Sequence, residues 1–267
     1  MTNAYYQLID RHVHEDGTVV ASYRSTLHAQ GAWNVHEQHM APATGIISAE
    51  LDRFSPRTDM RIGRISLDIL GLIPGGDFEI ETKLIRSGKT IELIESTMRA
   101  DGKACIQART WRMIKSDTTH IAGLEDQAQP SPELQPIWQA IHQWPGGYIA
   151  SLEARTSQHR CGKSMVWLTN PYDMVEDEPT SDFVRLMGMV DTANGVATRQ
   201  DVPFDFVFPN LDLQIHLYRM PQGKWLGLQT TQQYGQDGIG LTSSVLHDEQ
   251  GPFGHSEQIL TIRQMPK

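Results

Sequence analysis

Residues 40–54 read MAPATGIISAELDRF, and small or apolar side chains occur around most of the circumference of the helix that this run predicts. A helix with so little polar surface has to be enclosed by other elements. Four strand-like segments follow it at 61–72, 77–86, 90–99 and 104–115, and two precede it at 6–14 and 18–28. Hairpin turns such as Pro74-Gly75-Gly76 separate the later segments. The pattern predicts an α+β unit in which an antiparallel sheet wraps around one central helix.

A similar order of elements recurs in the second half of the chain. A second helix is predicted over 181–198, with Thr180 or Ser181 as its N-cap, and strands are predicted over 211–219, 224–234, 240–247 and 255–263. Short matches between the halves, such as Leu67-Asp68 with Leu211-Asp212, lie 144 to 149 residues apart. A duplicated unit explains this order most economically, the alternative being a chance recurrence of Pro-Gly turns.

The duplication predicts the domain boundaries. The N-terminal unit is expected over residues 1–116 and the C-terminal unit over residues 146–267. The intervening residues 117–145 contain Pro130, Pro132 and Pro136, a composition that predicts a linker with one short helix over about 132–143.

Composition excludes several classes of partner. The 267 residues carry 32 acidic and 23 basic side chains, for a net charge of −9, so a general affinity for nucleic acid or anionic lipid is not expected. Cys105 and Cys161 are too few for a disulfide framework and fit a reducing compartment. Residues 1–7 lack the pattern of a secretory signal, and the longest apolar stretch, 65–73, is too short to span a bilayer. We therefore expect a cytoplasmic protein with no membrane partner.

Histidine spacing argues against a metal centre. His36-Glu37-Gln38-His39 lacks the His-Glu-x-x-His spacing of a zinc protease, and the pair His12 and His14 has no obvious third ligand. No metal and no cofactor are expected.

Several motifs together resemble one known family. Gly31-Ala32-Trp33-Asn34 before the first helix, Leu67-Asp68 leading to Pro74-Gly75-Gly76, and Ser256-Glu257-Gln258-Ile259-Leu260 near the C-terminus resemble the type II, TesB-like acyl-CoA thioesterases over about residues 5–264. The resemblance implies a double hotdog, in which two tandem antiparallel sheets, each wrapped around a central helix, join side by side. It also implies hydrolysis of an acyl-CoA thioester to a free acid and CoA, without a cofactor.

The resemblance further implies three catalytic residues in the second unit. Asp212 corresponds to the family's aspartate, Thr231 to its threonine and Gln258 to its glutamine, with Thr230 left open as the alternative threonine. Such a triple suits the chemistry, because a carboxylate accepts a proton from water while a hydroxyl and an amide orient it. The start of a central helix is expected to stabilise the developing oxyanion.

Four further residues are candidates for substrate binding. A carboxylate in an apolar helix is costly to bury unless it is paired or functional, which makes Asp191 a rival site residue, and Asn194 lies one turn away. Trp33 and Asn34 belong to the motif before the first helix.

Other functions and partners stay open at this stage. A hotdog protein that binds an acyl or CoA ligand without turning it over is the main alternative. A hydratase of this fold would carry an Asp-x-x-x-x-His pair before the helix, and the sequence has none there. The phosphates of CoA would need local cations, for which Arg61, Arg64, Arg86 and Lys89 are unranked candidates. Joined hotdog sheets leave edges and faces that often pair, so a homodimer or higher oligomer is expected. The sequence does not predict the acyl chain length.

Overall fold

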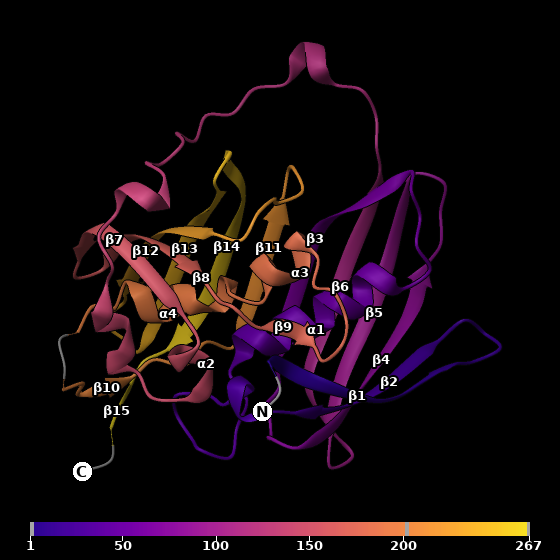
Figure 1. The fold of residues 1–267 in the computed structure, drawn as a ribbon, viewed down its shortest axis with the longest axis horizontal. Coiled ribbons are helices and arrows are strands. Elements are labelled where there is room, and N and C mark those ends of the chain that lie inside the picture. Colours follow the sequence, from indigo (N-terminus) through magenta and orange to yellow (C-terminus); the bar gives the residue numbers. More distant parts are fainter. Residues whose placement is uncertain (1–2, 201–202, 266–267) are drawn as a thin grey trace.

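One large sheet organises the computed structural model, which describes residues 3–200 and 203–265 (Figure 1). Its thirteen strands run in the order β7-β8-β12-β13-β14-β11-β3-β6-β5-β4-β2-β1-β9. The strands of the first half are β1 (Ala4–Val13), β2 (Val19–Ser25), β3 (Met60–Ile69), β4 (Asp77–Arg86), β5 (Ile91–Ala100) and β6 (Lys103–Ile114). Those of the second half are β7 (Glu153–Arg160), β8 (Lys163–Thr169), β9 (Asp173–Val175), β11 (Asp212–Leu217), β12 (Leu226–Tyr234), β13 (Ile239–Asp248) and β14 (Gly251–Thr261).

The two halves of the sheet meet at β3 and β11. These strands pair antiparallel, with Asp212 opposite Asp68. Outward from this junction the order is β6-β5-β4-β2-β1 on one side and β14-β13-β12-β8-β7 on the other, so the two halves use the same order of strands. The short strand β9 belongs to the second half of the chain but pairs in parallel with β1, which ties the halves together a second time.

The first predicted helix is confirmed. Helix α1 spans Met40–Arg53, and twelve of its residues are buried, as expected of a helix enclosed by a sheet. Its N-cap His39 accepts a hydrogen bond at Nδ1 from the backbone N–H of Ala41. The predicted strands also agree with the structure to within a few residues in both halves, although β7, β9 and the two-stranded sheet of β10 (Phe206–Val207) with β15 (Arg263–Gln264) were not predicted.

The prediction of one continuous helix over 181–198 is wrong. The segment divides into α3 (Asp182–Met187), the 3-10 turn η5 (Val190–Thr192) and α4 (Ala193–Val196). Helix α3 ends at Gly188, where it passes so close to α1 that a Cβ atom on Gly45 would lie 2.9 Å from the Gly188 Cα. Apolar periodicity continues through the break, which is why the sequence gives no sign of it.

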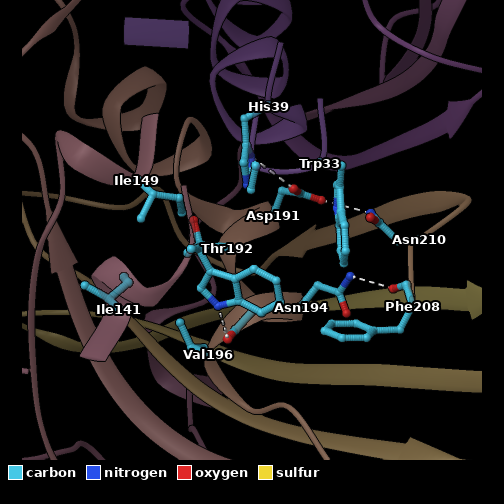
Figure 2. Close-up of a pocket in the computed structure, with 13 residues that line it drawn as sticks. Trp33, His39, Ile141, Ile149, Asp191, Thr192, Asn194, Val196, Phe208 and Asn210 are labelled. Carbon is cyan, nitrogen blue, oxygen red and sulfur yellow. Dashed lines mark hydrogen bonds and ion pairs between the residues drawn. The ribbon is translucent and has the colours of Figure 1, made fainter. Parts of the chain in front are cut away.

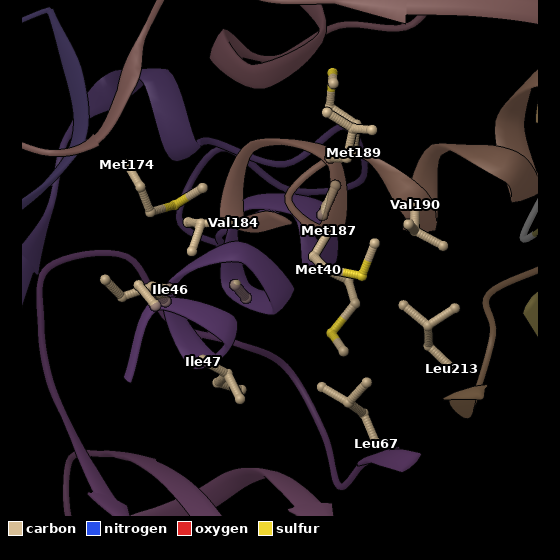
Figure 3. Packing of buried hydrophobic residues seen from close by; sticks show 14 of the residues in the cluster. Met40, Ile46, Ile47, Leu67, Met174, Val184, Met187, Met189, Val190 and Leu213 are labelled. Carbon is tan, nitrogen blue, oxygen red and sulfur yellow. The ribbon is translucent and has the colours of Figure 1, made fainter. Parts of the chain in front are cut away.

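The helices pack on the sheet through a methionine-rich core (Figure 3). Met40 and Ile47 of α1 and Met187 of α3 are at most 6% exposed, and Leu67 of β3 and Leu213 of β11 are fully buried. Flexible methionine side chains fill the irregular space where two helices cross above a sheet junction. This crossing holds the start of α1 against η5.

The connection between the halves arches over the top of the molecule in the view of Figure 1. It contains three 3-10 turns, η2 (Thr119–Ile121), η3 (Pro132–Leu134) and η4 (Gln139–Gln143), so the prediction of one helix over 132–143 is wrong. Pro136 explains the interruption, because it has no N–H and disfavours helical backbone in the residue before it. A four-residue helix α2 (Gly147–Ala150) follows. Among the described residues, no helix is long and apolar enough to cross a bilayer.

Candidate active site

Two cavities share a wall at the start of α1 and η5. The smaller has a volume of about 50 Å³ and is lined by rings and aliphatic side chains, among them Trp144, Phe208, Ile141 and Val196. The larger, of about 440 Å³, is bordered by surface residues such as Leu72 and Leu211. Five residues line both cavities: Ala32, Trp33, His39, Asp191 and Asn210.

Asp191 is the buried carboxylate at this shared wall (Figure 2). Its Oδ1 accepts hydrogen bonds from Gln258 Nε2 at 2.8 Å and from Asn210 Nδ2 at 2.9 Å. Its Oδ2 receives no hydrogen bond from any described residue and lies 3.5 Å from His39 Nδ1. One oxygen is therefore held by two amides, while the other remains available to a ligand or a water molecule.

The environment of Asp191 disfavours its charge. Burial raises the pKa of this carboxyl from 3.8 to about 6, although the hydrogen bonds from Asn210 and Gln258 act in the opposite direction. A carboxyl group with a pKa near 6 is mostly ionised at neutral pH and accepts a proton more readily than an ordinary aspartate.

His39 does not neutralise this carboxylate. Burial lowers the pKa of its imidazole from 6.5 to about 3, so the ring is neutral at physiological pH. Its Nδ1 accepts the N–H of Ala41, which places the ring proton on Nε2. The 3.5 Å approach of His39 to Asp191 is therefore a contact with a neutral ring and not an ion pair.

A row of polar side chains supports Asp191 from the sheet below. Gln232 of β12 lies opposite Thr242 of β13, which in turn lies opposite Gln258 of β14. All three are fully buried. Gln232 Nε2 donates to Asn194 Oδ1 at 3.0 Å and to Thr242 Oγ1 at 3.1 Å, and Thr242 donates to the same Asn194 oxygen. The Oε1 atom of Gln258 has no hydrogen-bond partner among the described residues.

The three residues predicted as catalytic do not meet in the structure. Gln258 faces the helices, whereas Asp212 points to the opposite face of the sheet, because its neighbour Leu213 is the buried residue of that strand. Asp212 Oδ1 accepts the N–H of Ile259 at 2.7 Å, and its Oδ2 accepts from Gln214 at 3.1 Å. The side chain therefore stabilises a strand end.

The threonines are also separated from the site. Thr231 lies on the half-exposed outer face of β12, and Thr230 faces inward, where its hydroxyl bonds Ser244 at 2.8 Å. Neither threonine lines the cavities. The polar residue of β12 that reaches the site is Gln232, which was not predicted.

Of the four predicted substrate-binding residues, three line a cavity. Asp191 lies at the wall that the two cavities share, and Trp33 packs edge-on against Trp144 and Phe208 at centroid distances of 5.6 and 5.7 Å. Asn194 lines the same cavity but uses its amide within the protein, where its nitrogen donates to the Phe208 carbonyl at 3.1 Å. Asn34 is exposed outside both cavities and caps the backbone of His36.

The predicted cations lie elsewhere. Arg61 donates to the carbonyls of Leu217 and Tyr218, and Arg86 donates to that of Ile91. The one Lys or Arg among the described residues that line the two cavities is Arg263, at the edge of the larger one. The described residues hold no group of three His, Cys, Asp or Glu side chains suited to a metal ion.

Comparison with known proteins identifies the family. A model of the acyl-CoA thioesterase C-terminal domain matches residues 122–262, and one of the acyl-CoA thioesterase N-terminal domain matches residues 29–113. Because these matches cover most of the chain, the protein belongs to the acyl-CoA thioesterase family. The predicted resemblance to TesB-type enzymes is thereby confirmed. No curated protein sequence matches the chain.

Solved structures confirm the hotdog fold. A protein from Novosphingobium aromaticivorans is 13% identical with a TM-score of 0.73, over 96% of this chain and 98% of that chain. A hot dog fold protein of unknown function from Alicyclobacillus acidocaldarius is 12% identical with a TM-score of 0.73, over 96% and 97% of the two chains. The acyl-CoA thioesterase II TesB2 from Mycobacterium marinum is 14% identical with a TM-score of 0.66, over 96% of each chain.

Sequence reasoning missed His39, Asn210 and Trp144. His39 was considered only as a metal ligand, and Asn210 stands two residues before the aspartate that was chosen instead. One signal was present: β12, β13 and β14 each place two polar residues at alternate positions, such as Thr242 with Ser244. On strands that enclose a helix, such pairs indicate a buried polar site.

Proposed function

We propose that the protein hydrolyses acyl-CoA thioesters and that Asp191 is the general base. The observation that carries this proposal is the divided role of the Asp191 carboxylate, with Oδ1 bound by Gln258 and Asn210 and Oδ2 facing the cavities. Membership of the acyl-CoA thioesterase family supplies the substrate class.

In the proposed reaction, a water molecule in the cavities donates a hydrogen bond to Asp191 Oδ2. Asp191 removes this proton as the water oxygen attacks the thioester carbonyl, and a tetrahedral oxyanion forms. The C–S bond then breaks, the CoA thiolate leaves, and the proton on Asp191 goes to that sulfur. The products are the free acid and CoA, and no cofactor is required.

The start of α1 supplies the oxyanion site in this proposal. Met40 is the first residue of a 14-residue helix, so its N–H has no acceptor within the helix, and it lines the larger cavity. Backbone N–H groups at a helix N-terminus carry partial positive charge and stabilise a developing oxyanion.

The larger cavity receives the CoA part of the substrate. It is the more spacious cavity, it is bordered by exposed residues, and it carries Arg263. On a chain with a net charge of −9, this cation is positioned to attract a phosphate group.

The proposal includes the domain organisation. Two hotdog units in tandem, over 1–116 and 146–267, with a linker over 117–145, account for the matching strand orders on either side of the β3–β11 junction. We further propose a cytoplasmic protein that forms a homodimer or higher oligomer, because the outer strands leave sheet edges open to pairing.

The proposed function is tested by measuring thiol release between pH 4.5 and 8.5 with a series of acyl-CoA substrates that runs from acetyl-CoA to palmitoyl-CoA. The base must be ionised to act, so kcat/KM should fall tenfold per pH unit below about pH 6, the pKa of Asp191, and level off above it. Absence of thiol release from every acyl-CoA would contradict the proposal, and ligand binding without turnover would favour a non-catalytic binder.

A hydro-lyase is a second candidate, favoured by the contact between His39 and Asp191. The sequence offered no local Asp and His pair, but the fold brings one together from the two halves. In dehydration of a 3-hydroxyacyl thioester, the neutral His39 would have to take the α-proton at Nδ1, which already accepts the Ala41 N–H, while a protonated Asp191 donated to the leaving hydroxyl. Because Asp191 is mostly ionised at neutral pH, its pKa of about 6 favours hydrolysis there. Enoyl thioester absorbance without thiol release would identify the hydro-lyase instead.

A further inference from the structure

We propose that the smaller cavity is the acyl site and that it restricts the enzyme to short acyl groups. This inference rests on the proposed thioesterase function and specifies its substrate. It depends on three features of the cavity: its position beside Asp191, the buried apolar side chains on its inner side, and its volume.

The position of the cavity makes it the inner of the two compartments. Both cavities reach Asp191, but the larger one opens among exposed residues. A thioester carbonyl at Asp191 therefore divides the substrate at the shared wall. The CoA arm extends outward through the larger cavity, and the acyl group points inward.

Buried side chains form the inner side of this compartment. Ile141, Ile149 and Val196 are at most 4% exposed, and Figure 2 shows them across the cavity from Trp33 and Phe208. Trp144 is held by a hydrogen bond from its Nε1 to the Gly195 carbonyl and by stacking on Phe204 at a centroid distance of 4.7 Å. On this inner side the lining consists of bulky rings and aliphatic groups, so a longer chain meets a wall.

The volume sets the limit on chain length. An apolar cavity of about 150 Å³ holds a benzene molecule, so a cavity of about 50 Å³ accommodates only a few heavy atoms. Short acyl groups fit this space, whereas octanoyl and longer chains exceed it. One methylene in an apolar pocket changes discrimination by roughly 10-fold or more, so the cut-off should be steep.

A ladder of acyl-CoA substrates from two to sixteen carbons tests this limit on the full-length protein. We expect kcat/KM for butyryl-CoA to exceed that for dodecanoyl-CoA at least tenfold. Equal or faster hydrolysis of the long substrates would overturn the size limit while leaving the thioesterase function intact.

Enlarging the smaller cavity should shift the substrate preference toward longer acyl chains. Trp144→Ala is expected to raise the ratio of octanoyl-CoA to butyryl-CoA turnover at least tenfold. Trp138→Ala is the matched control, because Trp138 lies in the same connection but packs against His159 outside the cavity. If Trp144→Ala does not fold, Val196→Ala provides a smaller enlargement with the same expected direction. An unchanged ratio in the folded variant would overturn the assignment of this cavity to the acyl group.

Failure of the proposed function can be told apart from failure of this inference. If the wild-type protein releases no thiol from any substrate, the same ladder is measured as binding by calorimetry. At least tenfold tighter binding of butyryl-CoA than of dodecanoyl-CoA would then support the acyl site, and no preference would overturn it.

Discussion

The two halves of the sheet differ at one row of three residues. In the second half, Gln232, Thr242 and Gln258 lie side by side on β12, β13 and β14 beneath Asp191. In the first half, β4, β5 and β6 present Leu84, Ile94 and Thr110 in the corresponding register. The neighbouring row confirms the correspondence, because Thr82 bonds Ser96 at 3.0 Å and Thr230 bonds Ser244 at 2.8 Å.

This difference shows why two halves with the same order of strands carry one candidate site. Polar side chains at these positions are stable only when their hydrogen bonds are completed, and in the second half Asn194 and Asp191 complete most of them. In the first half, Ile94 is fully buried and the Thr110 hydroxyl has no partner among the described residues. The first half instead contributes the start of α1, with His39 and Met40, to the site of the second.

Replacing the base should produce the largest effect. Asp191→Asn is expected to lower kcat by about 10³-fold, within the roughly 10²- to 10⁴-fold range of general bases. Asp212→Asn, the control on the outer face of the same half, should leave kcat within twofold. Thiol release at pH 8 measures both, and loss of activity in the Asp212 variant alone would contradict the assignment.

Thermal unfolding at pH 8 separates this effect from misfolding. The pKa of Asp191 is raised on folding, so the folded state loses stability as pH rises from about 4 to about 6 and remains less stable above it. The Asn variant should therefore unfold at a temperature no lower than that of the wild type at pH 8.

Removing one backbone N–H at the start of α1 should have the next largest effect. Met40→Pro deletes the donor at a helix position that accepts proline, and the extended backbone of His39 (φ −72°, ψ 139°) suits a residue before proline. We expect kcat to fall by about 10²-fold, the lower end for an oxyanion donor. Met40→Ala keeps the N–H and loses only the side chain, so equal losses in the two variants would assign the effect to packing.

The smallest effect on kcat is expected from substitutions at Gln258 and at Thr110, which occupy corresponding positions in the two halves of the sheet. Gln258→Leu should lower kcat by about 10-fold to 10²-fold, because it removes the hydrogen bond that Gln258 donates to Asp191 Oδ1. Thr110→Val at the corresponding position should leave kcat unchanged and raise the free energy of unfolding by about 1 kcal/mol, since it removes an unpartnered buried hydroxyl. Steady-state kinetics and denaturant unfolding of both variants check this prediction, and a catalytic loss in Thr110→Val would show that the first half also takes part.

Local patterns in the sequence were sufficient to predict α1 and most of the strands of both halves. The apolar run at 40–54 predicted α1, and the glycine-containing turns predicted the hairpins of both halves. The break at Gly188 escaped prediction because it follows from the close crossing of α1 and α3, and a crossing depends on contacts between distant segments.

The site could be predicted only in part. The sequence indicated Gln258 as a catalytic residue and Asp191 as a substrate-binding residue. In the fold, Gln258 Nε2 donates to Asp191 Oδ1 at 2.8 Å. Asp212 was preferred because it stands at a strand start in a familiar motif, while the face that it occupies depends on which side of the sheet the helices cover.

The alternation and repetition of apolar residues are local properties of the chain, so they are sufficient to predict a helix enclosed by strands and its recurrence. The hydrogen bond between Asp191 and Gln258, the contact of His39 with Asp191 and the position of Trp144 in the small cavity bring together residues up to about 150 positions apart. Such contacts arise only when the β3–β11 junction and the helix crossing bring the halves together, because hydrogen bonds and cavity walls act over a few ångströms.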